Sequence, residues 1–368
     1  MVIKMNDETL KKKLMEGKSW EEFCDTIKMA GYLILKNSPD DPLTRAEGFR
    51  YLSRLTRIAL EAFLEYDDPL APVLFRPVHE TVKMGADNPD NFYQWASISG
   101  NYEYILKGNR GTVHYLGIGT YTGHYGTSGS MGETGYLEAK DIEIKKDGWF
   151  EIIISTKEYP KNWLRMEPET TSLIVRQTFL DKAKEVPANL TIERIGGEKG
   201  RRGLTPEFIA SGLSSAARLM FGAVTLFTNW VKMFKNRPNE LPPFDPAISM
   251  SAHGDPNIFY YHGYWQLQPD EALIVEVTPP ECDYWNFQLC NHWMESLDYR
   301  YHRISINKAS AKLREDGSVR IIVSSLNPNL DNWLDTEGHS FGTMCLRWVR
   351  ASSHPQPQTK VVKISEIE

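Results

Sequence analysis

The spacing of apolar residues along the chain changes near residue 91. In the first part, TRAEGFRYLSRLTRIALEAFLEY places Leu52, Leu55, Ile58 and Ala59 one, three or four positions apart, on one face of an α-helix. From Phe92 onward, stretches such as NFYQWASISG and WFEIIISTK are rich in aromatic and β-branched residues, with glycines between them, as is typical of strands and hairpins. The pattern predicts an N-terminal helical region over residues 1–90 and β structure after it.

One further helix is expected in the middle of the chain. Thr205 followed by Pro206 matches a helix N-cap with proline at the first helical position, and the helix should run to about Lys235. Its most apolar part, residues 219–234, is interrupted by polar side chains and is shorter than the ~20 apolar residues that a membrane span needs. We therefore expect a core or interface helix, within a connecting segment over residues 201–249, and no membrane span.

Three short motifs occur twice in the same order. They are Asp147-Gly148, Asn162-Trp163-Leu164 and Arg176, and then Asp316-Gly317, Asn332-Trp333-Leu334 and Arg347. The recurrence predicts an internal duplication that forms two related β domains, over residues 91–200 and 250–368. Several strands in each unit without alternating helices favour a jelly roll or β-sandwich. The expected fold is mainly β with α additions: two such domains, the N-terminal helical region and an inter-domain helix.

The repeated residues suit the corner of a β-fold. Asp-Gly supplies the positive φ of a hairpin turn, and an asparagine on the connection can satisfy the amides of the loop. Arg176 and Arg347 lie within strands, so each needs a carboxylate or several carbonyls as partner. Because both copies carry Asn-Trp-Leu and the arginine, we interpret these residues as architectural.

Much of the second half resembles a known family. The stretch GDPNIFYYHGYWQLQPDEALIVEV, followed by NPNLDNWLDTEGH and LRW, is similar to the bacterial domain-of-unknown-function family 1214, which often occurs with a companion family, 1254. The likeness is strongest from Gly254 to Trp348 and weaker in the first half. It implies a pair of jelly-roll-like β domains without an agreed activity, so no site residue can be transferred from the family.

The composition and the N-terminal sequence limit which partners and which cellular location are expected for the protein. A net charge of −6, without a basic stripe interleaved with aromatic residues, argues against a nucleic-acid partner. The N-terminus lacks an apolar segment followed by a cleavage site, so we expect a cytoplasmic protein unless a leader was removed. The four cysteines form no CxxC pair, which makes zinc ligation an unfavourable interpretation and agrees with reduced thiols.

The densest group of polar residues lies in YWNFQLCNHWMESLDYR. His292 is a candidate general acid or base, oriented by Glu295 or Asp298. Asn286, Gln288 and Arg300 are candidates for holding polar groups of a substrate. Asp335 and His339, which are specific to the second copy, form an alternative acid/base pair. The competing interpretation is a polar network between domains, without a reaction.

Three further features are candidates for binding. His253, Asp255 and His262 could surround a divalent metal, although Asp255 also begins a turn motif. The glycine-rich stretch 119–136, which carries His124, could close over a ligand. Aromatic residues such as Trp265 and Trp293 could stack on a sugar ring.

Three classes of function follow from these candidates. The favoured one is an enzyme, a hydrolase or lyase, that acts on a small organic or sugar-like substrate by acid/base chemistry in a cleft of the second β domain. The first alternative is a non-catalytic protein that binds a carbohydrate or another small ligand. The second is a structural protein that forms homo-oligomers. No cofactor is predicted apart from the metal alternative.

Overall fold

Helices form the beginning of the chain. The computed structural model describes residues 6–127, 131–197, 200–201 and 203–367. It begins with α1 (Asp7–Met15), α2 (Lys18–Asn37) and α3 (Pro42–Leu60), and a π-helical turn, η1 (Glu61–Glu65), continues α3. Asp41 caps α3 by accepting a hydrogen bond from the backbone N–H of Thr44, and Pro42 occupies the first turn, where a missing N–H costs nothing.

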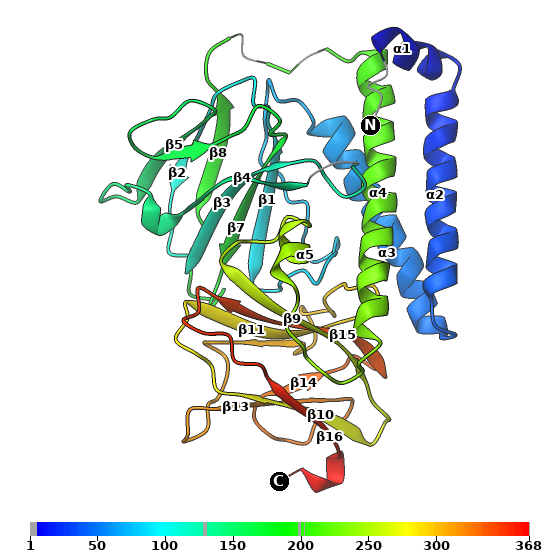
Figure 1. Ribbon diagram of the computed structural model, residues 1–368, viewed down its shortest axis with the longest axis vertical. Helices are drawn as coiled ribbons and strands as arrows, with labels where there is room; N and C mark the ends of the chain where they lie inside the picture. The colour runs from blue at the N-terminus through cyan, green and yellow to red at the C-terminus, as the bar shows by residue number, and fades with distance from the viewer. Residues whose placement is uncertain (1–5, 128–130, 198–199, 202, 368) are drawn as a thin grey trace.

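The long helix α4 (Pro206–Phe234) connects two β regions. Thr205 caps it by accepting from the N–H of Phe208, and Pro206 follows, as the sequence predicted. The helix is long and apolar enough to cross a membrane by composition alone, but its buried face packs against α2 and α3. In Figure 1, α4 runs alongside the first β region and ends near β9 and β15 of the second.

Each β region is a sandwich of two four-stranded sheets. The strands of the first are β1 (Asn91–Ser97), β2 (Tyr104–Asn109), β3 (Tyr115–Thr122), β4 (Gly132–Glu138), β5 (Trp149–Ser155), β6 (Trp163–Arg165), β7 (Ser172–Thr178) and β8 (Asn189–Arg194). A short 3-10 turn, η2 (Ala139–Asp141), follows β4. Apolar side chains of both sheets, among them Leu106, Ile118, Ile152 and Val175, form one core between them.

The second region has the same number of strands. They are β9 (Ile258–Gln266), β10 (Glu271–Val277), β11 (Tyr284–Cys290), β12 (Ser305–Asn307), β13 (Val319–Ser324), β14 (Trp333–Asp335), β15 (Phe341–Val349) and β16 (Gln358–Lys363). The short helix α5 (Pro246–Met250) precedes them, and the turn η3 (Ile364–Glu366) follows. Leu273, Phe287, Ile321 and Leu346 belong to the core of this second sandwich.

The two sandwiches have the same strand order. The sheets β1–β7–β3–β4 and β6–β5–β2–β8 in the first correspond to β9–β15–β11–β12 and β14–β13–β10–β16 in the second. Each sandwich also has a parallel contact at the same place, β5 with β6 and β13 with β14, whereas its other strand pairs are antiparallel. The structure therefore confirms a mainly β protein with N-terminal helices and a helix between two similar β domains (Figure 1).

The repeated Asn-Trp-Leu motif makes the same contacts in both copies. Asn332 adopts a φ of 57° and Asn162 a φ of 45°, the left-handed region that asparagine tolerates better than most residues. The side chain of Asn332 donates to the carbonyls of Lys312 and Arg320 and accepts from the N–H of Lys312. Asn162 does the same with Glu143 and Glu151. This confirms that the asparagine satisfies loop amides and carbonyls.

Replacing Asn332 with alanine should lower the free energy of unfolding by about 2–3 kcal/mol, because three hydrogen bonds to partly buried backbone groups are lost. Chemical denaturation followed by tryptophan fluorescence measures the change. Asn332→Gly should cost less than Asn332→Ala, because glycine adopts positive φ without strain. Asn236→Ala, at an exposed position, is the matched control and should change stability by less than about 0.5 kcal/mol. Equal stability of N332A and N236A would contradict the structural role.

Candidate ligand-binding site

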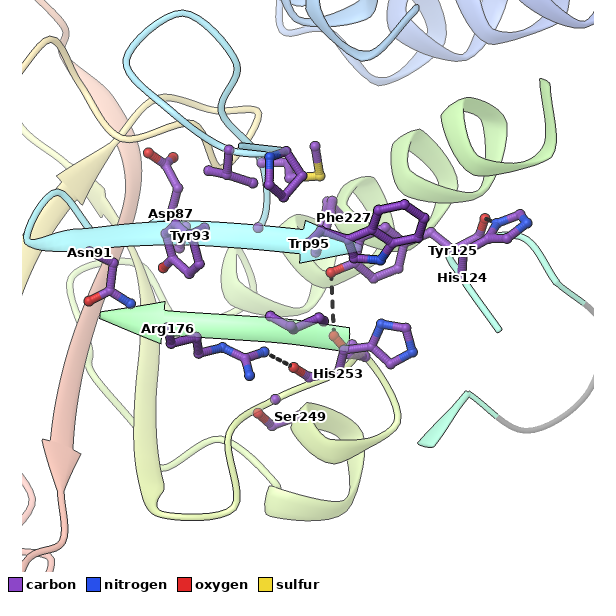
Figure 2. A pocket seen from close by; sticks show the side chains of 18 of the residues that line it. Asp87, Asn91, Tyr93, Trp95, His124, Tyr125, Arg176, Phe227, Ser249 and His253 are labelled. Carbon is purple, nitrogen blue, oxygen red and sulfur yellow. Dashed lines mark hydrogen bonds between the residues drawn. The ribbon is translucent and has the colours of Figure 1, made fainter. Parts of the chain in front are cut away.

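A cavity of about 230 Å³ lies between the two β domains. We call it the interdomain cavity. Residues of α3, η1, α4, β1, β7, β9 and β15 line it, together with the segments that precede β1 and β9. Most of its wall is apolar or aromatic, and the larger rings are Phe63, Phe75, Trp95, Tyr125, Phe227 and Trp230. Figure 2 shows several of these rings facing the same space as polar groups from the sheets. Cavities of this kind, with few polar groups in an apolar wall, are the usual form of a small-molecule site.

Both arginines of the internal repeat line this cavity. Arg176, which is 8% exposed, donates to the hydroxyl of Tyr121 at 2.9 Å and to the carbonyl of His253 at 2.5 Å (Figure 2). Arg347, which is 4% exposed, donates to the Oε1 atom of Gln288 at 2.6 Å and to the carbonyl of Ala86. Within the described part of the chain, neither guanidinium group forms an ion pair with a carboxylate.

The two arginines are held in a reciprocal way. Arg176 belongs to the first domain but binds a carbonyl just before β9, whereas Arg347 belongs to the second and binds a carbonyl just before β1. Both acceptor residues, His253 and Ala86, have positive φ, at 60° and 57°. Each lies five positions before the first residue of its strand, Ile258 or Asn91. The same contact between the domains, from an arginine of one domain to a backbone carbonyl that precedes the first strand of the other, therefore occurs twice.

The sequence also carries this repeat in a segment that precedes each arginine-bearing strand. Pro-x-x-Phe-Tyr occurs at Pro89–Tyr93 and again at Pro256–Tyr260. Tyr93 pairs with Arg176 across β1 and β7, and Tyr260 pairs with Arg347 across β9 and β15. Both tyrosines line the cavity.

Two carboxylates lie near the arginines but are bonded to other donors. Burial raises the pKa of Asp87, which accepts from the N–H and the hydroxyl of Ser296. Asp255 is 1% exposed and accepts from the hydroxyls of Tyr115 and Tyr136. The two carboxylates thus attract the arginines only through longer-range electrostatic interactions, without a hydrogen bond to either guanidinium group.

Three imidazoles in the cavity wall are uncharged near neutral pH. Burial lowers the pKa of His124 and His253 to about 4 and that of His262 to about 3. One ring nitrogen of His124 forms a hydrogen bond with the backbone carbonyl of Tyr125, and one of His253 with that of Thr122. The Nδ1 atom of His262 is buried and has no partner among the described residues.

Some residues predicted from the sequence lie at this cavity. His124 lines it directly. Asn286 and Gln288 lie behind Arg347 and accept its Nη1 hydrogens, so they orient the guanidinium group. The arginines themselves were interpreted as architectural, and their place at a cavity was not predicted.

The residues around His292 lie outside the cavity. His292 places Nδ1 3.0 Å from the Tyr264 hydroxyl and Nε2 3.1 Å from the Asn37 carbonyl, and burial lowers its pKa to about 4. Glu295 is 1% exposed and forms an ion pair with Arg54 at 2.6 Å. Asp298 accepts two hydrogen bonds from the guanidinium group of Arg300. The structure therefore does not join His292 to either carboxylate by a hydrogen bond.

The remaining candidates are also separate from one another. Asp335 accepts from His302 at 2.7 Å, and His339 lies 3.2 Å from a carboxylate oxygen of Glu47. The indole N–H groups of Trp265 and Trp293 donate to the carbonyls of Thr343 and Thr44, and both rings are fully buried. Neither tryptophan presents a face to a ligand here.

The metal alternative has no support in the geometry. Among the residues that the structure describes, no group of three histidine, cysteine, aspartate or glutamate side chains is placed to hold an ion. His253 binds the Thr122 carbonyl, Asp255 binds two tyrosines, and His262 is surrounded by aromatic rings. Each of the three side chains thus has other neighbours, and the metal alternative stays a prediction.

The fold and the cavity define a protein of two like β-sandwiches, joined by helices, with buried arginines at the domain junction. The chain belongs to the family described as Protein of unknown function (DUF1214), whose model matches residues 270–352. This confirms the resemblance seen in the sequence.

One similar solved structure covers nearly the whole chain. An uncharacterised protein from Burkholderia cenocepacia, known from a crystal structure, shares 50% identity at a TM-score of 0.95, with 97% of this chain and 100% of that chain covered. The crystal structure of a protein from Vibrio parahaemolyticus matches at 11% identity and a TM-score of 0.49, over 86% of this chain and 98% of that chain. No curated protein matches the sequence.

The buried histidines should make the protein less stable in acid. The pKa values of His124, His253, His262 and His292 are lowered in the folded state, so between about pH 7 and pH 4 these four side chains bind more protons in the unfolded chain than in the folded one. The free energy of unfolding should therefore fall as the pH falls from 7 to 5. Urea denaturation at both pH values measures the change.

Replacing one of these histidines isolates its share of the pH dependence. His262→Phe keeps an aromatic ring but cannot bind a proton, so its loss of stability between pH 7 and pH 5 should be smaller than that of the unmodified protein. Identical pH dependence in the two proteins would show that His262 titrates normally in the fold.

Proposed function

We propose that the protein binds a small organic anion in the interdomain cavity. The negatively charged group, a carboxylate or a similar oxyanion, lies against Arg176 and Arg347. The apolar body of the molecule lies against the aromatic wall. The observation that carries this proposal is the burial of two guanidinium groups at one cavity without a carboxylate partner among the described residues.

Hydrogen-bonding capacity supports the same conclusion. A guanidinium group has five N–H donors in a planar fork that matches a carboxylate or a phosphate. The protein accepts two hydrogen bonds from Arg176 and three from Arg347. Donors therefore remain on both groups, and an anion that displaced water would gain strong, charge-assisted hydrogen bonds in a desolvated site.

The cavity favours binding over acid/base catalysis. An effective general base has a pKa near the working pH. The pKa values of His124, His253 and His262 lie far below neutrality, so these imidazoles are weak bases. The enzyme predicted from the sequence, a hydrolase or lyase acting through His292, stays a prediction, as does a sugar-like substrate.

We also propose that the two β domains are jelly-roll variants that arose by internal duplication. Their equal strand order, the three repeated motifs and the repeated Pro-x-x-Phe-Tyr segment support a common origin. The proposals of a cytoplasmic location and of homo-oligomers rest on the sequence alone.

Calorimetric titration with matched anions and neutral amides tests the proposed function. Benzoate and phenylacetate should bind saturably, and benzamide and phenylacetamide should bind at least about tenfold more weakly, because only the anions form charge-assisted hydrogen bonds with the arginines. This comparison uses the unmodified protein, so it does not depend on the folding of a variant. Equal binding of acid and amide, or binding of neither, would overturn the proposal.

Arginine variants locate the charge that the anion meets. Arg347→Met and Arg176→Met keep an unbranched side chain but remove the charge, and each should weaken the affinity for phenylacetate by about tenfold or more. Arg347→Lys keeps the charge and should lose less. Arg45→Met, at an exposed position of α3, is the control and should bind normally. Thermal unfolding of each variant shows whether it is folded, and full affinity in a folded R347M would contradict the role of Arg347.

A further inference from the structure

We propose that the outer side of α2 is an interface with a second copy of this chain, whose own α2 lies antiparallel against it. We call this surface the α2 face. Its central residues, all exposed, are Glu21, Asp25, Lys28, Tyr32, Leu35 and Lys36. The inference does not depend on the proposed ligand, and it names a surface for the homo-oligomer that was one expectation from the sequence.

Exposed apolar side chains are concentrated in this part of the molecule. Of the seventeen large ones that the described residues expose, seven lie within residues 15–49. Trp20, Met29 and Tyr32 of α2 are 55–57% exposed, and Leu35 is 45% exposed. Figure 1 shows α2 at the edge of the molecule, with α4 between it and the first β domain. Single exposed apolar residues are normal, but a cluster of them on a helix marks a surface that associates with a partner.

The area of the α2 face suits a dimer of ordinary size. A large apolar side chain covers about 200 Å² when fully buried, so the four half-exposed side chains of α2 and Phe49 of α3 together offer roughly 500 Å² of apolar surface. The charged side chains between them bring the face close to the ~800 Å² that each partner buries in a stable, specific complex. Two-fold dimers in which the same surface is used by both copies are the commonest oligomers.

The exposed residues have the spacing with which one helix packs along another. Alternating steps of four and three residues separate Glu21, Asp25, Lys28, Tyr32 and Leu35. Residues at these steps lie on one side of a helix, as in the seam of a coiled coil. At 20 residues, α2 is about 30 Å long, so two such helices can stay in contact over several turns.

The charges on the α2 face favour an antiparallel partner. Glu21 and Asp25 lie in the first half of the helix, and Lys28 and Lys36 lie in the second. Lys18, at the start of the helix, forms a salt bridge with the preceding turn, whereas none of the other four does so within the described part of the chain. In an antiparallel pair the acidic half of each helix meets the basic half of the other, but a parallel pair would oppose like charges.

Gly31, beside the α2 face, leaves room for a second helix. Glycine is a poor helix former compared with alanine. A Cβ atom at this position would lie 3.9 Å from its nearest neighbours, the side chains of Leu52 and Phe49, which is an ordinary contact. An alanine would therefore fit within one chain, so packing inside the chain does not account for the glycine. Close approach of a partner helix does account for it.

Sedimentation velocity of the unmodified protein tests the interface. The protein should sediment as a dimer at about 10 μM, and Leu35→Lys should raise the dissociation constant of the dimer at least about tenfold, because it places a charge in the apolar part of the face. Leu326→Lys is the matched control, at a position of the second β domain that is 61% exposed, and it should sediment like the unmodified protein. Thermal unfolding shows whether each variant is folded, and Tyr32→Glu replaces L35K if that variant is not.

A charge exchange tests the orientation of the two helices. Asp25→Lys or Lys28→Asp alone opposes like charges across an antiparallel pair, so each should weaken the dimer at least about tenfold. The double variant D25K/K28D brings opposite charges together again and should dimerise nearly as well as the unmodified protein. In a parallel pair the double variant would still oppose like charges, so it would not recover. Both positions are exposed, so the fold should tolerate these changes.

The outcomes decide the proposal without reference to the ligand. A monomer at about 50 μM would overturn it. If that monomer sedimented with vesicles of anionic phospholipid, the α2 face would be a membrane-binding surface instead. A dimer that persists in folded L35K and Y32E would mean that another surface holds the copies together. Failure of D25K/K28D to recover would overturn the antiparallel arrangement. In each case the proposed binding of an anion in the interdomain cavity stands or falls separately.

Discussion

The burial of two guanidinium groups at the domain junction is the constraint on which the rest of this structure depends. Removing an ion from water costs several kcal/mol even after relaxation, so each charge needs compensation from nearby dipoles. Arg176 obtains it from Tyr121 and the His253 carbonyl, and Arg347 from Gln288 and the Ala86 carbonyl. Because each acceptor carbonyl precedes the first strand of the other domain, the charges fix how the two sandwiches meet.

This arrangement also explains the backbone strain at the junction. Ala86 and His253 have positive φ, which costs of order 1–3 kcal/mol for a residue with a side chain. The left-handed conformation turns the carbonyl of each toward a guanidinium group, so the strain is offset by hydrogen bonds to a charged donor. Strained residues that persist beside a cavity are typical of functional sites, where the surrounding contacts determine the conformation.

Local structure could be predicted from the sequence. The cap at Thr205, the Asn-Trp-Leu corner and the strand-rich regions depend on neighbouring residues, so their patterns could be recognised. The cavity could not, because it is formed by segments that are far apart in the chain and meet only in the folded protein. The polar residues around His292 have the composition of an active site. A structural network whose polar groups bond to one another, as Glu295 does with Arg54, has the same composition. An active site differs from a structural network in having polar atoms without a hydrogen-bond partner in the protein. Whether an atom has such a partner depends on the tertiary structure, so the sequence does not reveal it.

The two similar β domains nevertheless enclose an asymmetric cavity. Tyr93 and Tyr260 occupy equivalent places, but two residues further along the strand the first domain has Trp95 where the second has His262. On the next strand, Gly117 lies beside Arg176 where Asn286 lies beside Arg347, and Gly119 corresponds to Gln288. Near its arginine, the first half of the cavity thus has Trp95, whereas the second has His262, with Gln288 behind the guanidinium group of Arg347. Two equal halves would suit a symmetric ligand, but substitutions at corresponding positions make the two halves of this cavity chemically different. That difference favours a molecule whose own two ends differ in polarity.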